Sequence, residues 1–111
     1  MPPREWRLRV EDILEAIAKI EQYVEGLTFD QFQSDQKTVD AVVRNLEVIG
    51  EAVRHLSAAH ESLPSSIAWT DVAGMRNILI HEYFGVDLNI IWQTVTHDLP
   101  ELRDQLRNIG G

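Results

Sequence analysis

The chain lacks cysteine altogether and has no long apolar run among its 111 residues. The absence of cysteine excludes disulfides, thiolate metal ligands and cysteine nucleophiles. No apolar stretch approaches the roughly 18 residues that a membrane-spanning helix needs, and the first five residues do not resemble a signal peptide. We therefore expect a cytoplasmic protein with one domain, residues 1–111, and no membrane partner.

Basic residues are also few. The chain has 10 Lys and Arg against 18 Asp and Glu, which gives a net charge of −8. A protein that coats nucleic acid takes its affinity from many cationic contacts to phosphates, so this balance argues against that class. It remains compatible with a local basic cleft for RNA or with a basic protein partner.

Strand-like alternation and internal repeats are absent, whereas apolar residues recur at the i, i+3, i+4 spacing of amphipathic helices. The expected elements are a first helix over 6–26, a short helical turn over 28–32, a second helix from a cap at Ser34 or Asp35 to about 59, a third over about 70–84, and a fourth from 87 that continues through 100–109. Short links between such helices predict an all-α, antiparallel four- to five-helix bundle.

Several details of these helices can be predicted. Gly26 is expected to stop the first helix, Gly50 to permit a close helix crossing, and Asp87 to cap the fourth helix, while Pro100 leaves open whether the last segment is one kinked helix or two. We interpret the acidic face of the first helix as solvated; it comprises Glu11, Asp12, Glu15, Glu21 and Glu25. Charged residues three and four apart can pair along the second helix; they are Arg44, Glu47, Glu51 and Arg54.

Chemically capable residues are concentrated in the stretch from 74 to 85. Asn77 and His81 are four apart and share a helix face, and Arg76 and Tyr83 are seven apart and lie within about 20° of each other. Arg76 and His81 are separated by about 140° on an ideal helix, so a long arginine side chain or a loosened last turn before Gly85 must close that gap.

The residue types in this stretch restrict the chemistry. His81 and Glu82 begin like a zinc-binding helix motif, but position 85 is glycine where the second histidine should stand, so no metal is expected. Glycine-rich phosphate loops are missing too, and we expect no cofactor. An arginine can hold a phosphate and a histidine can move a proton, which suffices for attack of an RNA 2′-hydroxyl on its adjacent phosphate. A two-fold dimer would supply a second histidine as the acid.

The pattern Arg76, four residues, His81, one residue, Tyr83 resembles the Arg-x4-His-x-Tyr motif of the HepT toxins within the HEPN superfamily. The resemblance extends over nearly the whole chain. It includes the segments 44–52, 74–77 and 81–87, Trp69, and 99–102 near the end.

This resemblance implies a HEPN-like helical-bundle homodimer that acts as a metal-independent ribonuclease, the toxin of a prokaryotic toxin–antitoxin pair. Arg76 and His81 correspond to the catalytic residues, and Asn77 to the supporting polar residue. The implied partners are RNA and a minimal nucleotidyltransferase antitoxin that transfers AMP from ATP onto Tyr83.

Two other interpretations remain open. The chain could be a non-catalytic helical partner of a nucleotidyltransferase in which Arg76 and His81 hold a nucleotide or substrate. Alternatively, the stretch could form a dimer-interface helix with Tyr83 packed in the core. Loss of RNA cleavage in a folded His81→Ala variant would distinguish a catalyst from the binding partner. A Tyr83→Phe variant that changes neither activity nor regulation would indicate the interface helix.

Overall fold

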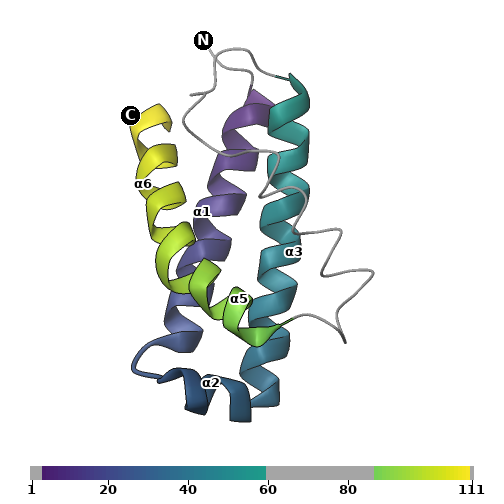
Figure 1. Ribbon diagram of the computed structural model, residues 1–111. Coiled ribbons are helices and arrows are strands. Elements are labelled where there is room, and N and C mark those ends of the chain that lie inside the picture. The colour runs from purple at the N-terminus through teal and green to yellow at the C-terminus, as the bar shows by residue number, and fades with distance from the viewer. Residues whose placement is uncertain (1–3, 60–86, 111) are drawn as a thin grey trace.

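Two long antiparallel helices, α1 (Arg4–Val24) and α3 (Gln36–Ala59), lie side by side along the bundle (Figure 1). The structure is a computed structural model that describes residues 4–59 and 87–110. Every regular element within these ranges is a helix, which confirms the all-α prediction. The predicted third helix, over about 70–84, lies outside the described residues.

The core forms where the apolar stripes of these helices meet α5 (Leu88–Gln93) and α6 (Leu99–Gly110). Its fully buried side chains include Ile13, Ile17, Ile20, Phe32, Val42, Leu46, Val53 and Leu106. Burying such side chains stabilises the fold by about 1.5–3 kcal/mol each before conformational entropy is subtracted. This core fixes α1 between α3 on one side and α6 on the other, as the contacts between these elements show.

The ends of α1 and α3 follow from local chemistry. Gly26 has a φ of +76°, a left-handed conformation that favours glycine, so the predicted stop is confirmed, although α1 itself ends at Val24. At the start of α3 the carboxylate of Asp35 accepts hydrogen bonds from the Thr38 hydroxyl at 2.7 Å and the Thr38 N–H at 3.3 Å. Gly50 is buried on α3, and the close crossing predicted for it stays a prediction.

The short helix α2 (Phe29–Ser34) crosses the end of the bundle between α1 and α3 (Figure 1). Thr28 and Gln31 form a capping box, in which each side chain accepts a hydrogen bond from the other residue's N–H. Phe32 is fully buried and its ring packs against Trp92 of α5 at a centroid distance of 5.1 Å, with Phe29 at 6.1 Å from the same ring. The aromatic residues thus pack over the bundle end as predicted.

The last part of the chain is one bent helix. Between α5 and α6 runs the π-helical segment η2 (Thr94–Asp98), where the N–H of Leu99 bonds to the carbonyl of Thr94, five residues back. The hydroxyls of Thr94 and Thr96 donate to the carbonyls four residues before them, at 3.0 and 2.8 Å. Such bonds bend helices, and Pro100 has no N–H to donate. Together they account for the change of direction from α5 to α6 in Figure 1.

No helix in the described ranges is long and apolar enough to cross a membrane.

Candidate functional site

The four residues predicted from the sequence to form the site, Arg76, Asn77, His81 and Tyr83, all lie outside the described residues. Their roles therefore stay predictions from the sequence. The described helices that carry charged side chains can nevertheless be analysed for what they bring together.

Asp87 is the first described residue after the predicted motif, four positions beyond Tyr83 in the sequence. Its carboxylate accepts a hydrogen bond from the Asn89 N–H at 2.8 Å and another from the Asn89 side chain at 3.0 Å. This confirms Asp87 as the N-cap of α5, and removing such a cap typically costs about 1 kcal/mol. Trp92 of α5 packs on α2. The helix that follows the predicted motif in the sequence is therefore fixed against the end of the bundle.

A charged hollow of about 230 Å³ lies between α1 and α3. We call it the charged hollow; its lining residues are Arg9, Asp12, Arg44, Glu47, Val48, Glu51 and Ala52. The α3 members follow the i, i+3, i+4, i+7, i+8 spacing, so that helix presents one face to it. The hollow therefore joins residues from two helices whose sequence positions are more than 30 apart.

The charges in this hollow are mixed in sign. Arg44 lies 3.6 Å from Glu47, which confirms one of the predicted pairs along α3, and its side chain is 74% exposed. Glu51 lies 3.2 Å from the imidazole of His55 one turn later. With two arginines and three carboxylates in the lining, the hollow has no excess of positive charge for holding phosphate groups.

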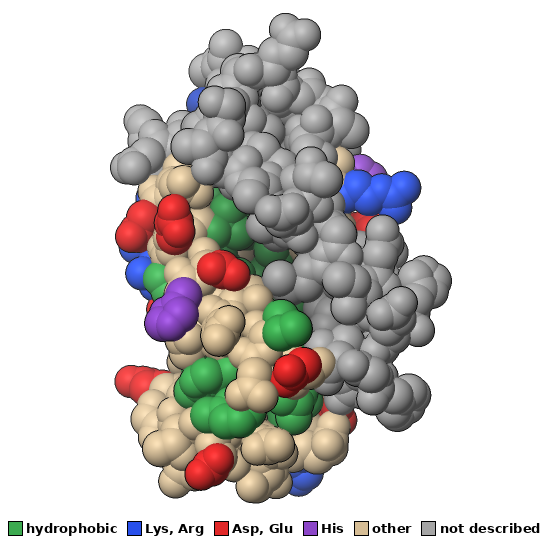
Figure 2. Space-filling view, viewed as in Figure 1, with side chains coloured by type: hydrophobic (Ala, Val, Ile, Leu, Met, Phe, Trp, Pro, Cys, Tyr) green, Lys and Arg blue, Asp and Glu red, His purple; other side chains and the backbone are tan. Residues whose placement is uncertain are grey.

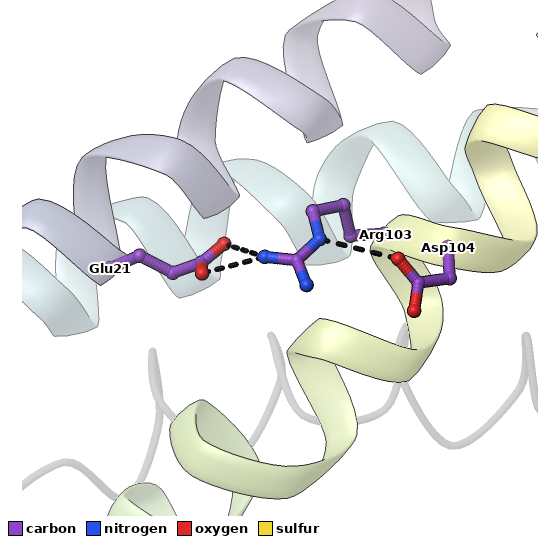
Figure 3. A network of polar contacts seen from close by, with 3 residues as sticks. All are labelled: Glu21, Arg103 and Asp104. Carbon is purple, nitrogen blue, oxygen red and sulfur yellow. Dashed lines mark hydrogen bonds and ion pairs between the residues drawn. The ribbon is translucent and has the colours of Figure 1, made fainter.

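A second ionic contact joins α1 to α6 on another side of the bundle (Figure 3). The Nη1 atom of Arg103 lies 2.6 Å from both carboxylate oxygens of Glu21, and its Nε lies 3.5 Å from Asp104. The hydrogen bond to Glu21 raises the pKa of the Arg103 guanidinium above its ordinary value.

The contact corrects one interpretation from the sequence. Glu21 was assigned to a solvated acidic face, yet its side chain is only 38% exposed and is held by an arginine of another helix. Glu21 and Arg103 are 82 positions apart, and a single sequence carries no signal that pairs them. Glu11, Asp12, Glu15 and Glu25 are exposed, in agreement with that interpretation.

The surface reflects the acidic composition. In Figure 2 acidic side chains are spread over the described part of the face shown, and basic side chains lie mainly at its margins. In the part of the chain that the structure describes, no group of three or more His, Asp or Glu side chains is placed to hold a metal ion.

Comparison with known proteins gives one family. The model of the HepT-like family, described as ribonuclease HepT-like, matches residues 13–109. This span includes the predicted motif and all the described elements except the ends of the first and last helices.

Individual relatives agree with this match. The chain is 42% identical to a protein named probable ribonuclease HepT from Thermococcus cleftensis, over 90% of this chain and 91% of that protein. It is also 42% identical to a protein named "putative RNase" from Caldanaerobacter subterraneus subsp. tengcongensis, over 90% and 89% of the two chains. A protein of the same description from Methanocaldococcus jannaschii is 38% identical over 100% of this chain and 95% of its own length. No solved structure matches the chain significantly.

Proposed function

This chain belongs to the HepT-like ribonuclease family, and on that premise we propose that it is an endoribonuclease that acts as the toxin of a toxin–antitoxin pair. One observation carries the proposal: the span matched by the family model contains Arg76, His81 and Tyr83 at the complete Arg-x4-His-x-Tyr spacing. The relatives bear names that refer to ribonuclease activity, which supports the same reaction class for this chain.

The proposed reaction needs only a proton carrier and a phosphate binder. His81 takes the proton of an RNA 2′-hydroxyl, and the 2′-oxygen attacks the adjacent phosphorus. The bond from phosphorus to the 5′-oxygen breaks, and that oxygen receives a proton from the His81 of a second copy. The guanidinium of Arg76 neutralises the extra charge on the phosphoryl oxygens during attack, with Asn77 in support. The products are a 2′,3′-cyclic phosphate and a 5′-hydroxyl, and the step needs no metal.

The test is RNA cleavage by purified His81→Ala protein, with His97→Ala as the matched control. His97 is an exposed histidine of η2, so the control makes the same substitution outside the motif. Loss of a general base or acid should lower the cleavage rate by about 10²–10⁴-fold, whereas the control should keep it. Equal activity of both variants would overturn the proposal.

Regulation is proposed to act through Tyr83. A partner nucleotidyltransferase brings ATP, the tyrosine oxygen attacks the α-phosphorus, and pyrophosphate leaves as the phenol loses its proton. The added AMP brings a negative charge and a bulky base close in sequence to Arg76, so it should block RNA by occupying the arginine.

Intact mass followed by peptide mapping tests this step, because the chain has one other tyrosine for comparison. Tyr23 is 39% exposed on α1, so it is accessible to a non-selective enzyme. Mass increases in steps of AMP that map to Tyr83 and not to Tyr23, together with loss of cleavage, are the expected result. Modified protein that cuts RNA as fast as unmodified protein would contradict the switch.

The acidic charge of the chain favours one alternative function, a non-catalytic partner that holds a nucleotide or substrate for the nucleotidyltransferase. Such a protein would bind nucleotide through Arg76 and His81 and would never cut RNA. Nucleotide affinity that falls in His81→Ala, with no cleavage by the wild type, would replace the ribonuclease proposal by this one.

A further inference from the structure

The chain enters α5 through Asp87, which is held by hydrogen bonds on both its main chain and its side chain. Its backbone is extended, with φ −74° and ψ 119°, and the helix begins at the next residue. Its carbonyl accepts hydrogen bonds from the N–H groups of Ile90 and Ile91 at 3.0 and 3.3 Å. Its carboxylate accepts two more from Asn89, at 2.8 and 3.0 Å. Together these bonds set the direction in which the chain enters the helix.

Side chains further along α5 hold this end of the helix against the bundle. Ile91 is 3% exposed and belongs to the core. The ring of Trp92 packs on that of Phe32, which is itself fully buried, at a centroid distance of 5.1 Å. A helix as short as the six residues of α5 is marginal by itself, so these contacts keep it in place. Asp87 is thus anchored to the core through the helix that it caps.

Asp87 is also close to the predicted motif along the chain. It follows Tyr83 by four positions and His81 by six. Because one residue spans at most about 3.6 Å, the Cα atoms of Tyr83 and His81 lie within about 14 and 22 Å of the Cα atom of Asp87. A change at Asp87 therefore acts on both residues through a short tether. Misplacing reacting groups by roughly 1 Å can slow a reaction about a hundredfold.

We propose that Asp87 is a positioning residue for RNA cleavage, whose cap on α5 holds the end of the motif in the orientation that His81 needs. This inference deepens the proposed function and rests on it for the reaction. Asp87 acts through the backbone by accepting hydrogen bonds, and its negative charge plays no part. An uncharged side chain that accepts the same bonds should therefore replace it.

Two other roles of this exposed carboxylate make different predictions. A carboxylate that moves a proton in the reaction would need its ionisable group, so an amide would not replace it. A cap that only stabilises α5 would change the melting temperature but not the turnover of protein that is folded. Substitution by alanine and by asparagine, each measured on folded protein, separates these roles from positioning.

The test compares three variants under conditions in which circular dichroism shows each to be folded. Asp87→Ala removes the cap and should lower kcat for RNA cleavage by about 10–100-fold with little change in KM, because positioning is lost and binding is kept. Asp87→Asn keeps an acceptor at the same place and should restore kcat to within about twofold of the wild type. Asp35→Ala is the matched control and should keep kcat. It removes a carboxylate that likewise accepts from one N–H and one side chain, at the start of α3.

Hydrogen exchange measured by mass spectrometry gives a second readout that needs no RNA. Peptides that cover residues 76–86 should exchange faster in Asp87→Ala than in the wild type. In Asp87→Asn and Asp35→Ala they should exchange at the wild-type rate. Exchange over 76–86 that is the same in all four proteins would contradict the anchor.

Three kinetic results would overturn the positioning role: unchanged kcat in Asp87→Ala, an asparagine variant as slow as the alanine variant, or an equal loss in Asp35→Ala. The two proposals fail separately. A wild type that cuts no RNA, but whose exchange over 76–86 depends on the cap, contradicts the ribonuclease function and supports the anchor. A wild type that cuts RNA no faster than Asp87→Ala contradicts the positioning role alone.

Discussion

The two sides of α1 differ in how their charges are held. On one side Glu21 is bound at 2.6 Å by Arg103 of α6, and the pair is partly shielded from solvent. On the other side, in the charged hollow, Arg44 lies 3.6 Å from Glu47, its neighbour one turn later on the same helix. The comparison shows that one side of α1 is closed by another helix of the same chain, whereas the other side borders a hollow of mixed charge.

The largest expected effect comes from breaking the closed side. Leu106 of α6 is fully buried, so Leu106→Ala should lower the free energy of unfolding by about 2–5 kcal/mol. Leu8→Ala is the matched control: Leu8 is 49% exposed and lies within about 40° of Asp12 around α1. Its effect should stay below about 0.5 kcal/mol in urea unfolding. Equal losses in the two variants would contradict the distinction between the sides.

A double-mutant cycle measures the ionic difference directly. Arg103→Met keeps the apolar stem while Glu21→Gln removes the partner charge, and their coupling should be about 1 kcal/mol because the hydrogen bonds are short and charge-assisted. The same cycle with Arg44→Met and Glu47→Gln should give less than about 0.5 kcal/mol, since Arg44 is largely exposed. Coupling that is larger in the hollow than across α1 and α6 would reverse the comparison.

The smallest effect concerns a charge that belongs to neither side. Hydrogen bonds from the Thr38 hydroxyl, and then from its N–H, lower the pKa of the Asp35 carboxyl below its ordinary value. A lowered folded-state pKa contributes stability above the unfolded value and loses it as the pH falls through the folded one. Asp35→Ala should therefore lower the melting temperature slightly at pH 7, and the difference from wild type should shrink below about pH 4. A difference that grows in acid would contradict this cap.

The helices could be predicted from the sequence because each has a local cause. Apolar periodicity located α1 and α3, Gly26 stopped the first of them, and Asp87 capped α5. The sequence did not decide whether the last segment is one bent helix or two separate helices. The answer depends on whether the threonine hydroxyls and Pro100 convert one helical turn to a π turn.

The charged residues of the candidate site were also predictable only in part. The motif residues Arg76, His81 and Tyr83 were singled out by their spacing and assigned roles by the resemblance to a family motif, and they lie outside the described residues. The Glu21–Arg103 contact and the charged hollow were not predictable, since both join helices through tertiary packing. The spacing of charged residues along α3 did predict the ion pair between Arg44 and Glu47.

The most direct measurement is the identity of the ends left when purified, unmodified protein is incubated with an RNA and with DNA of the same sequence in the presence of a metal chelator. Attack by the 2′-hydroxyl predicts that the RNA alone is cut and that mass spectrometry finds 2′,3′-cyclic phosphate and 5′-hydroxyl ends. Cleavage of the DNA, RNA ends carrying a 5′-phosphate, or no cleavage at all under these conditions would contradict the proposed ribonuclease chemistry.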